Sequence, residues 1–266
     1  MRAKKILLSN LALALVLISS SALADLPYNV CSDLTSCQSQ AAAGDMKAEY
    51  NLGLIYDDGI NVKADYTLAA QWYQKSATQG LSIAQYRLGL LYYNGNGVPQ
   101  DKKMAVQLYE QAASQGSSYS QYQLGIMYQT GDGVPQDYQK AMSYYLQSAA
   151  GGDPDGSVGA GIMYKNGYGV SKDFKKAVSF YTQAVNAGDS DGAYDLGLLY
   201  YLGGPGVPQD LVKSYAWFAA ANAMTPNDPD TMRLKGEVYN FLTPNEQPEA
   251  KTLAQQYVTQ YGGSGN

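Results

Sequence analysis

The sequence predicts an all-α fold, a solenoid of stacked antiparallel helix pairs, and three observations lead to this fold class. Glycines recur at intervals of 36 residues, and the residues around them are repeated as well. Within each period, apolar residues follow the spacing of two amphipathic helices. The pattern changes at both ends, as a capped repeat array requires. The recurring glycines are Gly59, Gly95, Gly131, Gly167 and Gly203.

The first 24 residues have the pattern of a secretory signal peptide and are not expected to belong to this fold. Basic residues lie at the start, an apolar run spans residues 6–18, and Ala22-Leu23-Ala24 follows as a small-x-small cleavage site. The run is too short for a stable membrane span. We expect cleavage after Ala24 and a periplasmic or secreted mature chain with no membrane insertion.

Charge excludes some partners of that mature chain. Three of the 18 basic residues lie in the signal peptide and none of the 23 acidic ones does, so 15 against 23 leaves a net charge of −8. An acidic chain with scattered charges is a poor match for nucleic acid or anionic lipid. We therefore expect no nucleic-acid partner.

Residues 25–44 are predicted to form a half-repeat that caps the N-terminal end, because Gly44 stands 36 residues before Gly80. The segment holds the only two cysteines, Cys31 and Cys37. An even pair in an exported chain favours a disulfide. On one continuous helix the two would stand about 9 Å apart on different faces, beyond bridging distance. Either Cys31 precedes the helix and the pair is bonded, which we favour, or both thiols are free.

Each repeat is predicted to contain two helices. In the first one, Ala48, Leu52, Ile55 and Tyr56 form a single apolar stripe. Gly53 lies within this helix, where glycine costs roughly 1 kcal/mol relative to alanine, so we expect another helix to approach closely. The recurring glycine then ends the helix in a left-handed turn, and a proline-containing loop follows.

The second helix of each repeat begins at an aspartate placed as an N-cap and closes at another glycine. The capping aspartates are Asp65, Asp101, Asp137, Asp173 and Asp210. The predicted repeats are 45–80, 81–116, 117–152, 153–188 and 189–225. Residues 226–266 lose the repeat glycines but keep a helical pattern around 231–242 and 248–261, which indicates C-terminal capping helices and a tail.

The repeated pattern L-G-x-x-Y-x-x-G-x-G-V-x-x-D-x-x-x-A-x-x-x-Y-x-x-A resembles the Sel-one-like repeat (SLR), a relative of the tetratricopeptide repeat. The resemblance covers residues 45–225, with departures at Asn61, at Ala160 and in the extra residue around Gly203. It implies a right-handed solenoid with a concave groove. It also implies an adaptor or scaffold, and exported bacterial members are implicated in envelope assembly or host contact.

Catalytic and metal-binding arrangements find little support in these residues. The absence of histidine excludes Ser-His-Asp and Cys-His schemes, and two cysteines are too few for a structural zinc site. The Gly-x-Gly segments follow helices, which favours turns over phosphate loops. Asp57-Asp58-Gly59 and Asp132 with Asp137 lack the spacing of a calcium loop. We expect no enzyme, no cofactor and no metal, and a monomer.

Two kinds of first-helix residue are candidate partner contacts. Some are residues whose identity varies from repeat to repeat, and the others are tyrosines that lie next to these variable positions. One such row reads Asp57, Tyr93, Gln129, Lys165 and Tyr201, and a neighbouring row reads Lys47, Ile83, Tyr119, Asp155 and Asp191. By analogy with helix-pair repeats these rows line the concave groove, and tyrosine is favoured in interface anchors. The alternative is solvated or half-packed positions without a ligand. The candidates are Tyr50, Tyr86, Tyr93, Tyr119, Tyr122, Gln129, Lys165, Tyr194 and Tyr201.

Three functions are open on these grounds. The leading hypothesis is an exported scaffold that binds a protein or peptide in its groove. The alternative is a peptidoglycan- or carbohydrate-binding module, because aromatic-lined grooves also suit sugar faces. A cell-wall enzyme using a carboxylate pair is compatible with the composition, but no such pair stands outside the repeat pattern.

Overall fold

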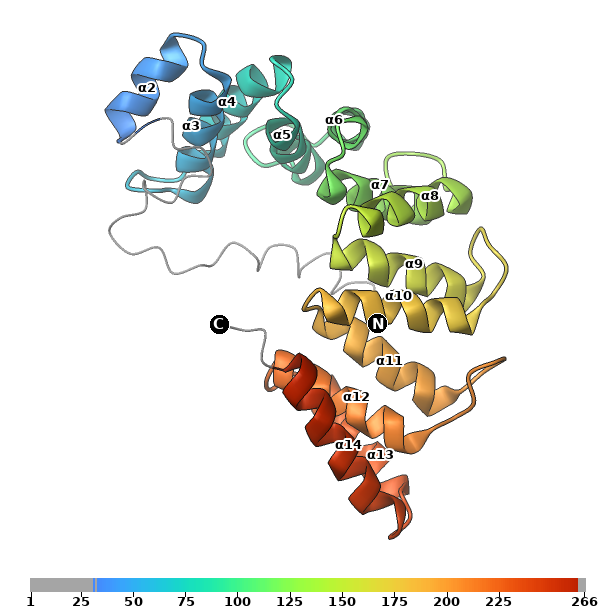
Figure 1. The fold of residues 1–266 in the computed structure, drawn as a ribbon. Helices are drawn as coiled ribbons and strands as arrows, with labels where there is room; N and C mark the ends of the chain where they lie inside the picture. Colours follow the sequence, from blue (N-terminus) through green and yellow to red (C-terminus); the bar gives the residue numbers. More distant parts are fainter. Residues whose placement is uncertain (1–30, 32, 263–266) are drawn as a thin grey trace. The chain divides into compact units, whose positions relative to one another are not determined.

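The computed structural model describes Cys31 and residues 33–262, and these residues form thirteen helices and no strand (Figure 1). The first helices of the five repeats are α3 (Met46–Asp58), α5 (Ser82–Asn94), α7 (Ser118–Thr130), α9 (Pro154–Asn166) and α11 (Ser190–Leu202). The second helices are α4 (Tyr66–Thr78), α6 (Lys102–Ser114), α8 (Tyr138–Ala150), α10 (Phe174–Asn186) and α12 (Leu211–Met224). The array is preceded by α2 (Leu34–Ala42) and followed by α13 (Pro229–Phe241) and α14 (Glu246–Tyr261).

The predicted signal peptide, residues 1–24, lies outside the described residues. Among the helices that are described, none is long and apolar enough to cross a membrane.

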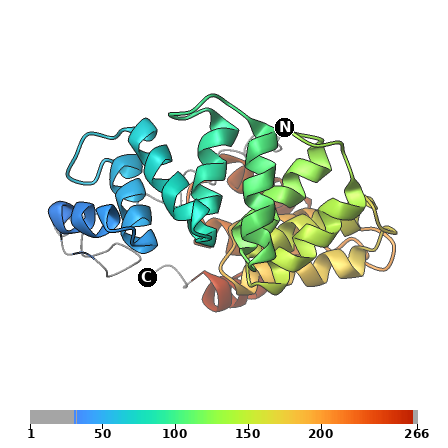
Figure 2. The same ribbon diagram turned by 90° about the horizontal axis from the view of Figure 1, so that it is seen from above.

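The chain divides into two compact units, Met1–Asp101 and Lys102–Asn266. In the first unit α2 packs on α3, α3 on α4 and α4 on α5, and Figure 2 shows these helices in blue to cyan. In the second unit consecutive helices pack from α6 to α13, and α14 packs along α12. Each helix therefore buries its apolar side against its neighbours in sequence, which confirms the predicted α-solenoid of stacked helix pairs.

Aspartate N-caps begin four of the five second helices, as the sequence predicts. The carboxylate of Asp65 accepts hydrogen bonds from the backbone N–H groups of Thr67 and Leu68, at 2.9 and 3.0 Å. Asp137, Asp173 and Asp210 cap α8, α10 and α12 in the same way. These side chains satisfy N–H groups that lack partners within the helix.

The glycine that ends the first helix adopts a left-handed conformation in four repeats, with φ between 69° at Gly59 and 76° at Gly95. The prediction of the same turn at Gly203 is wrong. There φ is 65° but ψ is 178°, and a bridge between Gly204 and Val207 closes the turn instead. The extra residue in this loop requires a different path.

Glycines within the first helices let an aromatic ring of the second helix lie directly on the backbone. A Cβ atom on Gly125 would be 2.6 Å from the ring of Tyr145, and one on Gly197 would be 2.8 Å from the ring of Phe218. Both distances are below 3.0 Å, which Cβ atoms in proteins essentially never show, so a side chain there would force a neighbouring group to shift. The expected close approach of a second helix is therefore confirmed, and the second-helix ring is what approaches.

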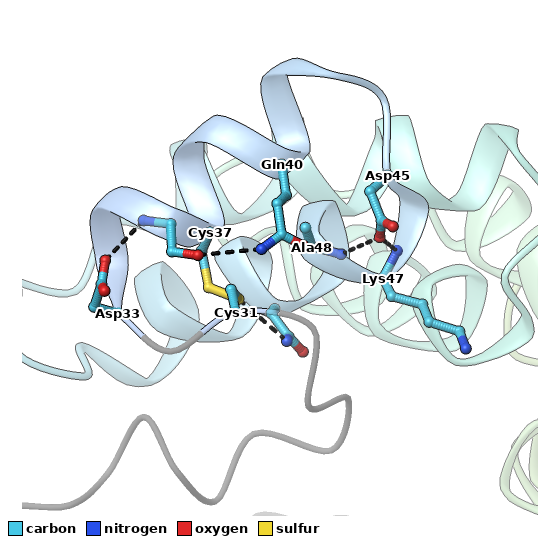
Figure 3. The surroundings of a disulfide bond; sticks show 9 residues. Cys31, Asp33, Cys37, Gln40, Asp45, Lys47 and Ala48 are labelled. Atoms are coloured by element: carbon cyan, nitrogen blue, oxygen red, sulfur yellow. Dashed lines mark hydrogen bonds between the residues drawn. A yellow bond between two sulfur atoms is a disulfide. The ribbon is translucent and has the colours of Figure 1, made fainter.

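The N-terminal cap contains a disulfide between Cys31 and Cys37, with the two Cα atoms 5.0 Å apart (Figure 3). Asp33 caps α2, so Cys31 precedes the helix, which is the geometry that allows the two cysteines to meet. The side-chain amide of Asn51 on α3 donates to the sulfur of Cys31 at 3.7 Å. The disulfide therefore lies between the cap and the first repeat.

At the opposite end, aromatic side chains of α14 cover Trp217 of α12. The ring of Trp217 lies 4.4 Å from that of Tyr257 and 5.3 Å from that of Tyr261, centroid to centroid. Both predicted C-terminal helices are present, and each begins two residues earlier than expected. They cover the last repeat as capping helices do.

Candidate functional site

The first helices of the second unit, α7, α9 and α11, lie next to one another and share a partly exposed side. Residues at i, i+7 and i+10 along each helix fall on this side, because at 3.6 residues per turn they lie within an arc of about 80°. We call these nine residues the first-helix face. They are Tyr119, Ile126 and Gln129 on α7, Asp155, Ile162 and Lys165 on α9, and Asp191, Leu198 and Tyr201 on α11.

The middle of the first-helix face is an aliphatic row that the sequence analysis missed. Ile126, Ile162 and Leu198 are each half-buried, whereas Leu54 at the equivalent position of repeat one is 5% exposed. Each of these residues directly follows the mid-helix glycine or its equivalent, so in sequence it looks like part of the core stripe. The sequence did contain a sign of this row, because an apolar residue adjoins the core stripe at this position in every repeat.

Three of the candidate tyrosines belong to the core instead. Tyr50, Tyr122 and Tyr194 are 1%, 6% and 7% exposed. The ring of Tyr50 lies 5.6 Å from that of Tyr73, and Tyr122 and Tyr194 pack in the same way on the second-helix aromatics. The expectation that these three rings line an accessible groove is corrected accordingly, because almost all of their surface is used in packing.

The remaining candidates are more accessible. Tyr119 is 57% exposed, and Gln129, Lys165 and Tyr201 are half-buried on the first-helix face. Tyr86 and Tyr93 are half-buried on α5, which belongs to the first unit. The structure thus brings four of the nine predicted contacts together in the second unit.

Residues at the C-terminal end of the first-helix face are partly exposed and also contact side chains of the core. The side-chain oxygen of Gln129 accepts a hydrogen bond of 2.6 Å from the hydroxyl of Tyr145. The ammonium of Lys165 lies 3.4 Å from the carboxylate of Asp195 and 5.7 Å from the ring centroid of Tyr181. These positions therefore have a structural role in addition to the proposed partner contact.

An apolar surface continues from the first-helix face at the end of α11. The ring of Tyr201 lies 6.4 Å from that of Phe241, and Phe241 and the neighbouring Leu202 are 61% and 71% exposed. Phe241 comes from α13, outside the repeat pattern, so no periodic row could have identified it.

The row at the N-terminal end is acidic. Asp153 caps α9, where its carboxylate accepts a hydrogen bond of 3.1 Å from the backbone N–H of Asp155, and Asp189 caps α11 by accepting one of 2.8 Å from Gly192. Burial, followed by repulsion from Asp189, Asp153 and Asp191, raises the pKa of Asp155 to about 7. Burial is also the main cause that raises the pKa of Asp189 to about 6. The sequence signal is a repeated Asp-x-Asp at the start of the two helices.

The hydroxyl of Tyr122 lies beside these carboxylates. Burial, followed by the charge of Asp155 and smaller effects that include Asp153 and Asp189, raises the pKa of Tyr122 well above its ordinary value. Tyr122 is 6% exposed, its hydroxyl forms no hydrogen bond to any described residue, and its oxygen is not among the fully buried atoms that lack a partner. The hydroxyl of Tyr122, which has no hydrogen-bond partner among the described residues, therefore adjoins these aspartates.

The first-helix face is better suited to contact with a partner than to catalysis or metal binding. Among the described residues, no three or more His, Cys, Asp or Glu side chains are grouped as a metal site. What this geometry supports is recognition of a partner through an apolar strip with a charged border.

Stacked helix pairs with a variable, partly exposed side define a helical repeat scaffold. The family model described as Sel1 repeat matches five times, at residues 47–81, 82–117, 118–153, 157–189 and 190–224. The chain belongs to the Sel1 repeat family, whose members are generally non-catalytic scaffolds for protein interaction.

Two solved structures are similar along most of this chain. A Sel1 repeat protein from Oxalobacter formigenes is 27% identical, with a TM-score of 0.71 over 83% of this chain and 89% of that one. The protein c5321, a protective antigen present in uropathogenic Escherichia coli strains and displaying an SLR fold, is 28% identical. Its TM-score is 0.52 over 86% of this chain and 56% of the antigen. No match was found among curated proteins.

Proposed function

We propose that this chain is an exported scaffold that binds a protein or peptide segment along the first-helix face. The observation that carries the proposal is the half-exposed aliphatic row Ile126, Ile162 and Leu198, beside the exposed ring of Tyr119. An apolar strip with a polar border is typical of an interaction site on a soluble protein. Tyrosine provides a large contact area at low entropic cost, which suits an anchor.

Export is supported by the signal-peptide pattern of residues 1–24 and by the Cys31–Cys37 disulfide. Disulfides form and persist in oxidising compartments such as the periplasm and the extracellular space. The family resemblance implies a part in envelope assembly or host contact, and the 28% identity to a protective antigen agrees with host contact. We expect the mature chain to act as a monomer.

Capture of partners from envelope extract tests this function. Wild-type protein is compared with the double variant Tyr119→Ala/Tyr201→Ala, which removes both aromatic rings from the first-helix face. The control is Tyr66→Ala/Tyr168→Ala, since these tyrosines are 45% and 39% exposed but lie off the face. We expect the face variant to lose partners that the control retains. Equal capture by both folded variants would reject the assignment.

A second candidate function is carbohydrate binding, and a cleft among α6, α7 and α8 favours it. The cleft has a volume of about 340 Å³, within the range of small-ligand sites. Its lining residues are Glu110, Ala113, Ser114, Tyr128, Lys140, Ser143, Tyr144 and Gln147. Tyr128 stacks on Tyr144 at 5.7 Å and donates a hydrogen bond of 3.2 Å to Glu110. Aromatic rings beside a carboxylate and an amide suit a sugar.

Retention of purified protein on insoluble cell-wall glycan tests this second function. We expect Tyr144→Ala to be released while Tyr66→Ala, with its exposed tyrosine elsewhere, is retained. Failure of the wild type to bind the glycan would remove the carbohydrate hypothesis and leave the scaffold function untouched.

A further inference from the structure

The acidic end of the first-helix face carries information about the partner. The first turns of α9 and α11 contain Asp153, Asp155, Asp189 and Asp191. Repulsion between these carboxylates contributes to the raised pKa values of Asp155 and Asp189. The ion pairs formed among the described residues include none of these four. The basic residue of the same face, Lys165, is paired with Asp195 instead. Among the described residues, the four carboxylates are thus left without a cationic partner.

Helix capping accounts for only half of this charge. Asp153 and Asp189 accept backbone hydrogen bonds as N-caps, so their presence has a structural explanation. The carboxylates of Asp155 and Asp191 accept no such bond. The helix dipole favours an acid in the first turn by only about 0.3–1 kcal/mol. A raised pKa at Asp155 means that folding disfavours its charge, so the ionised carboxylate does not serve stability.

The Tyr122 hydroxyl is an independent observation at the same place. Its ring is 6% exposed and fixed against Tyr145, while its oxygen adjoins the carboxylates and forms no hydrogen bond within the described chain. This oxygen is not among the fully buried polar atoms that lack a partner, so it remains open to water and to a ligand. Its oxygen is an acceptor suited to an N–H donor that enters among the aspartates.

We propose that the acidic end of the first-helix face binds a lysine- or arginine-bearing segment of a protein partner, with the cationic group between Asp155 and Asp191. The proposal rests on the scaffold function above and names the chemistry of its partner. The aliphatic stem of the basic side chain packs toward Ile162 and Leu198, while its head donates to the carboxylates. Apolar neighbours of the basic residue occupy the aliphatic row.

Binding of synthetic peptides to the full mature chain, followed by fluorescence anisotropy, tests this inference. The probe is a labelled peptide in which lysine and leucine alternate, and its counterpart has glutamate in place of lysine. The acid variant is Asp155→Asn/Asp191→Asn, which keeps side-chain shape and spares both N-caps. The charge-matched control is Glu237→Gln/Glu249→Gln on α13 and α14.

We expect the lysine peptide to bind wild type and control alike, and the acid variant to bind it about tenfold or more weakly, as for loss of close charge pairs. The glutamate peptide should not bind. Binding should also lower the pKa of Asp155, followed by NMR of its carboxyl carbon, because a nearby cation favours the ionised form. Equal weakening in the acid and control variants, or an unchanged pKa, would overturn the inference.

The same assay separates this inference from the proposed function. If Tyr119→Ala/Tyr201→Ala loses a peptide that the acid variant still binds, the face is a docking surface but does not select basic segments. If neither variant differs from its control with peptides or with envelope extract, the scaffold assignment of this face fails as well.

Discussion

The hydroxyl of Tyr145 donates a 2.6 Å hydrogen bond to the side-chain oxygen of Gln129, which ties a core tyrosine of α8 to the partly exposed side of α7. In repeat one the hydroxyl of Tyr73 donates to Asp57 at 3.0 Å in the same way. In repeat four the equivalent first-helix residue is Lys165, which accepts no hydrogen bond. The residue that varies on the surface therefore decides whether the core hydroxyl has an acceptor.

The first prediction compares two tyrosine-to-phenylalanine substitutions. Tyr145→Phe removes a made hydrogen bond and should lower the free energy of unfolding by about 0.5–1.5 kcal/mol. Tyr181→Phe should cost nothing or stabilise, because the Tyr181 hydroxyl is buried without a hydrogen-bond partner among the described residues. Urea unfolding of both variants measures the difference. Equal destabilisation would contradict the idea that the first-helix residue controls this bond.

The second prediction concerns the glycines beneath the aromatic rings. Gly125→Ala places a methyl group 2.6 Å from the Tyr145 ring, so the helices must separate. Overpacking of this kind costs typically 1–3 kcal/mol, which exceeds the roughly 1 kcal/mol gained in helix propensity. Gly236→Ala on α13 meets nothing within 4 Å and should stabilise by up to about 1 kcal/mol. Thermal unfolding of the two variants should shift in opposite directions.

The third prediction concerns the N-terminal cap. Cys31→Ser/Cys37→Ser removes a bond that closes a loop of sequence separation 6, worth about 2 kcal/mol in the chain-entropy model. Hydrogen exchange should accelerate in α2 and the adjoining part of α3 and remain unchanged in α7 to α12, because each repeat contacts only its neighbours. Thiol titration of denatured protein from the periplasm should find no free thiol, and two free thiols would refute the native disulfide.

The sequence was sufficient for the period, the helix pairs, four of the five aspartate caps and four of the five left-handed turns. Each of these depends on local chemistry that repeats, such as an N-cap at Asp137 or a positive φ at Gly131. Which side of a first helix remains accessible depends instead on three neighbours at once. The analogy with helix-pair repeats therefore placed Tyr122 in the groove, although its ring is buried against Tyr145.

The same limit explains what was missed on the first-helix face. Ile162 adjoins the core stripe, so its partial exposure depends on how closely α7 and α11 approach α9. Phe241 reaches Tyr201 from a helix outside the repeats. The charge on Asp155 was visible in the sequence, but its raised pKa arises first from burial and then from repulsion by Asp189, Asp153 and Asp191, two of which belong to the neighbouring repeat.

The fourth prediction follows from those carboxylates. The folded pKa values of about 7 for Asp155 and about 6 for Asp189 lie above the unfolded value of about 3.9. Folding thus favours the protonated forms, so their contribution to stability is complete below about pH 4 and is lost as the pH rises through about 6 to 7. Asp155→Asn should therefore stabilise the chain at about pH 8, on the order of 1 kcal/mol, and have little effect at about pH 4.

Unfolding midpoints measured across this pH range check the fourth prediction, with Glu249→Gln on α14 as the control that removes an exposed carboxylate. A gain in stability that is the same at both ends of the range would contradict the assigned titration. The binding experiment gives the complementary result. If Asp155→Asn stabilises the chain yet weakens its hold on a lysine peptide, the aspartate is retained for recognition at a cost in stability, as is usual for residues that serve function.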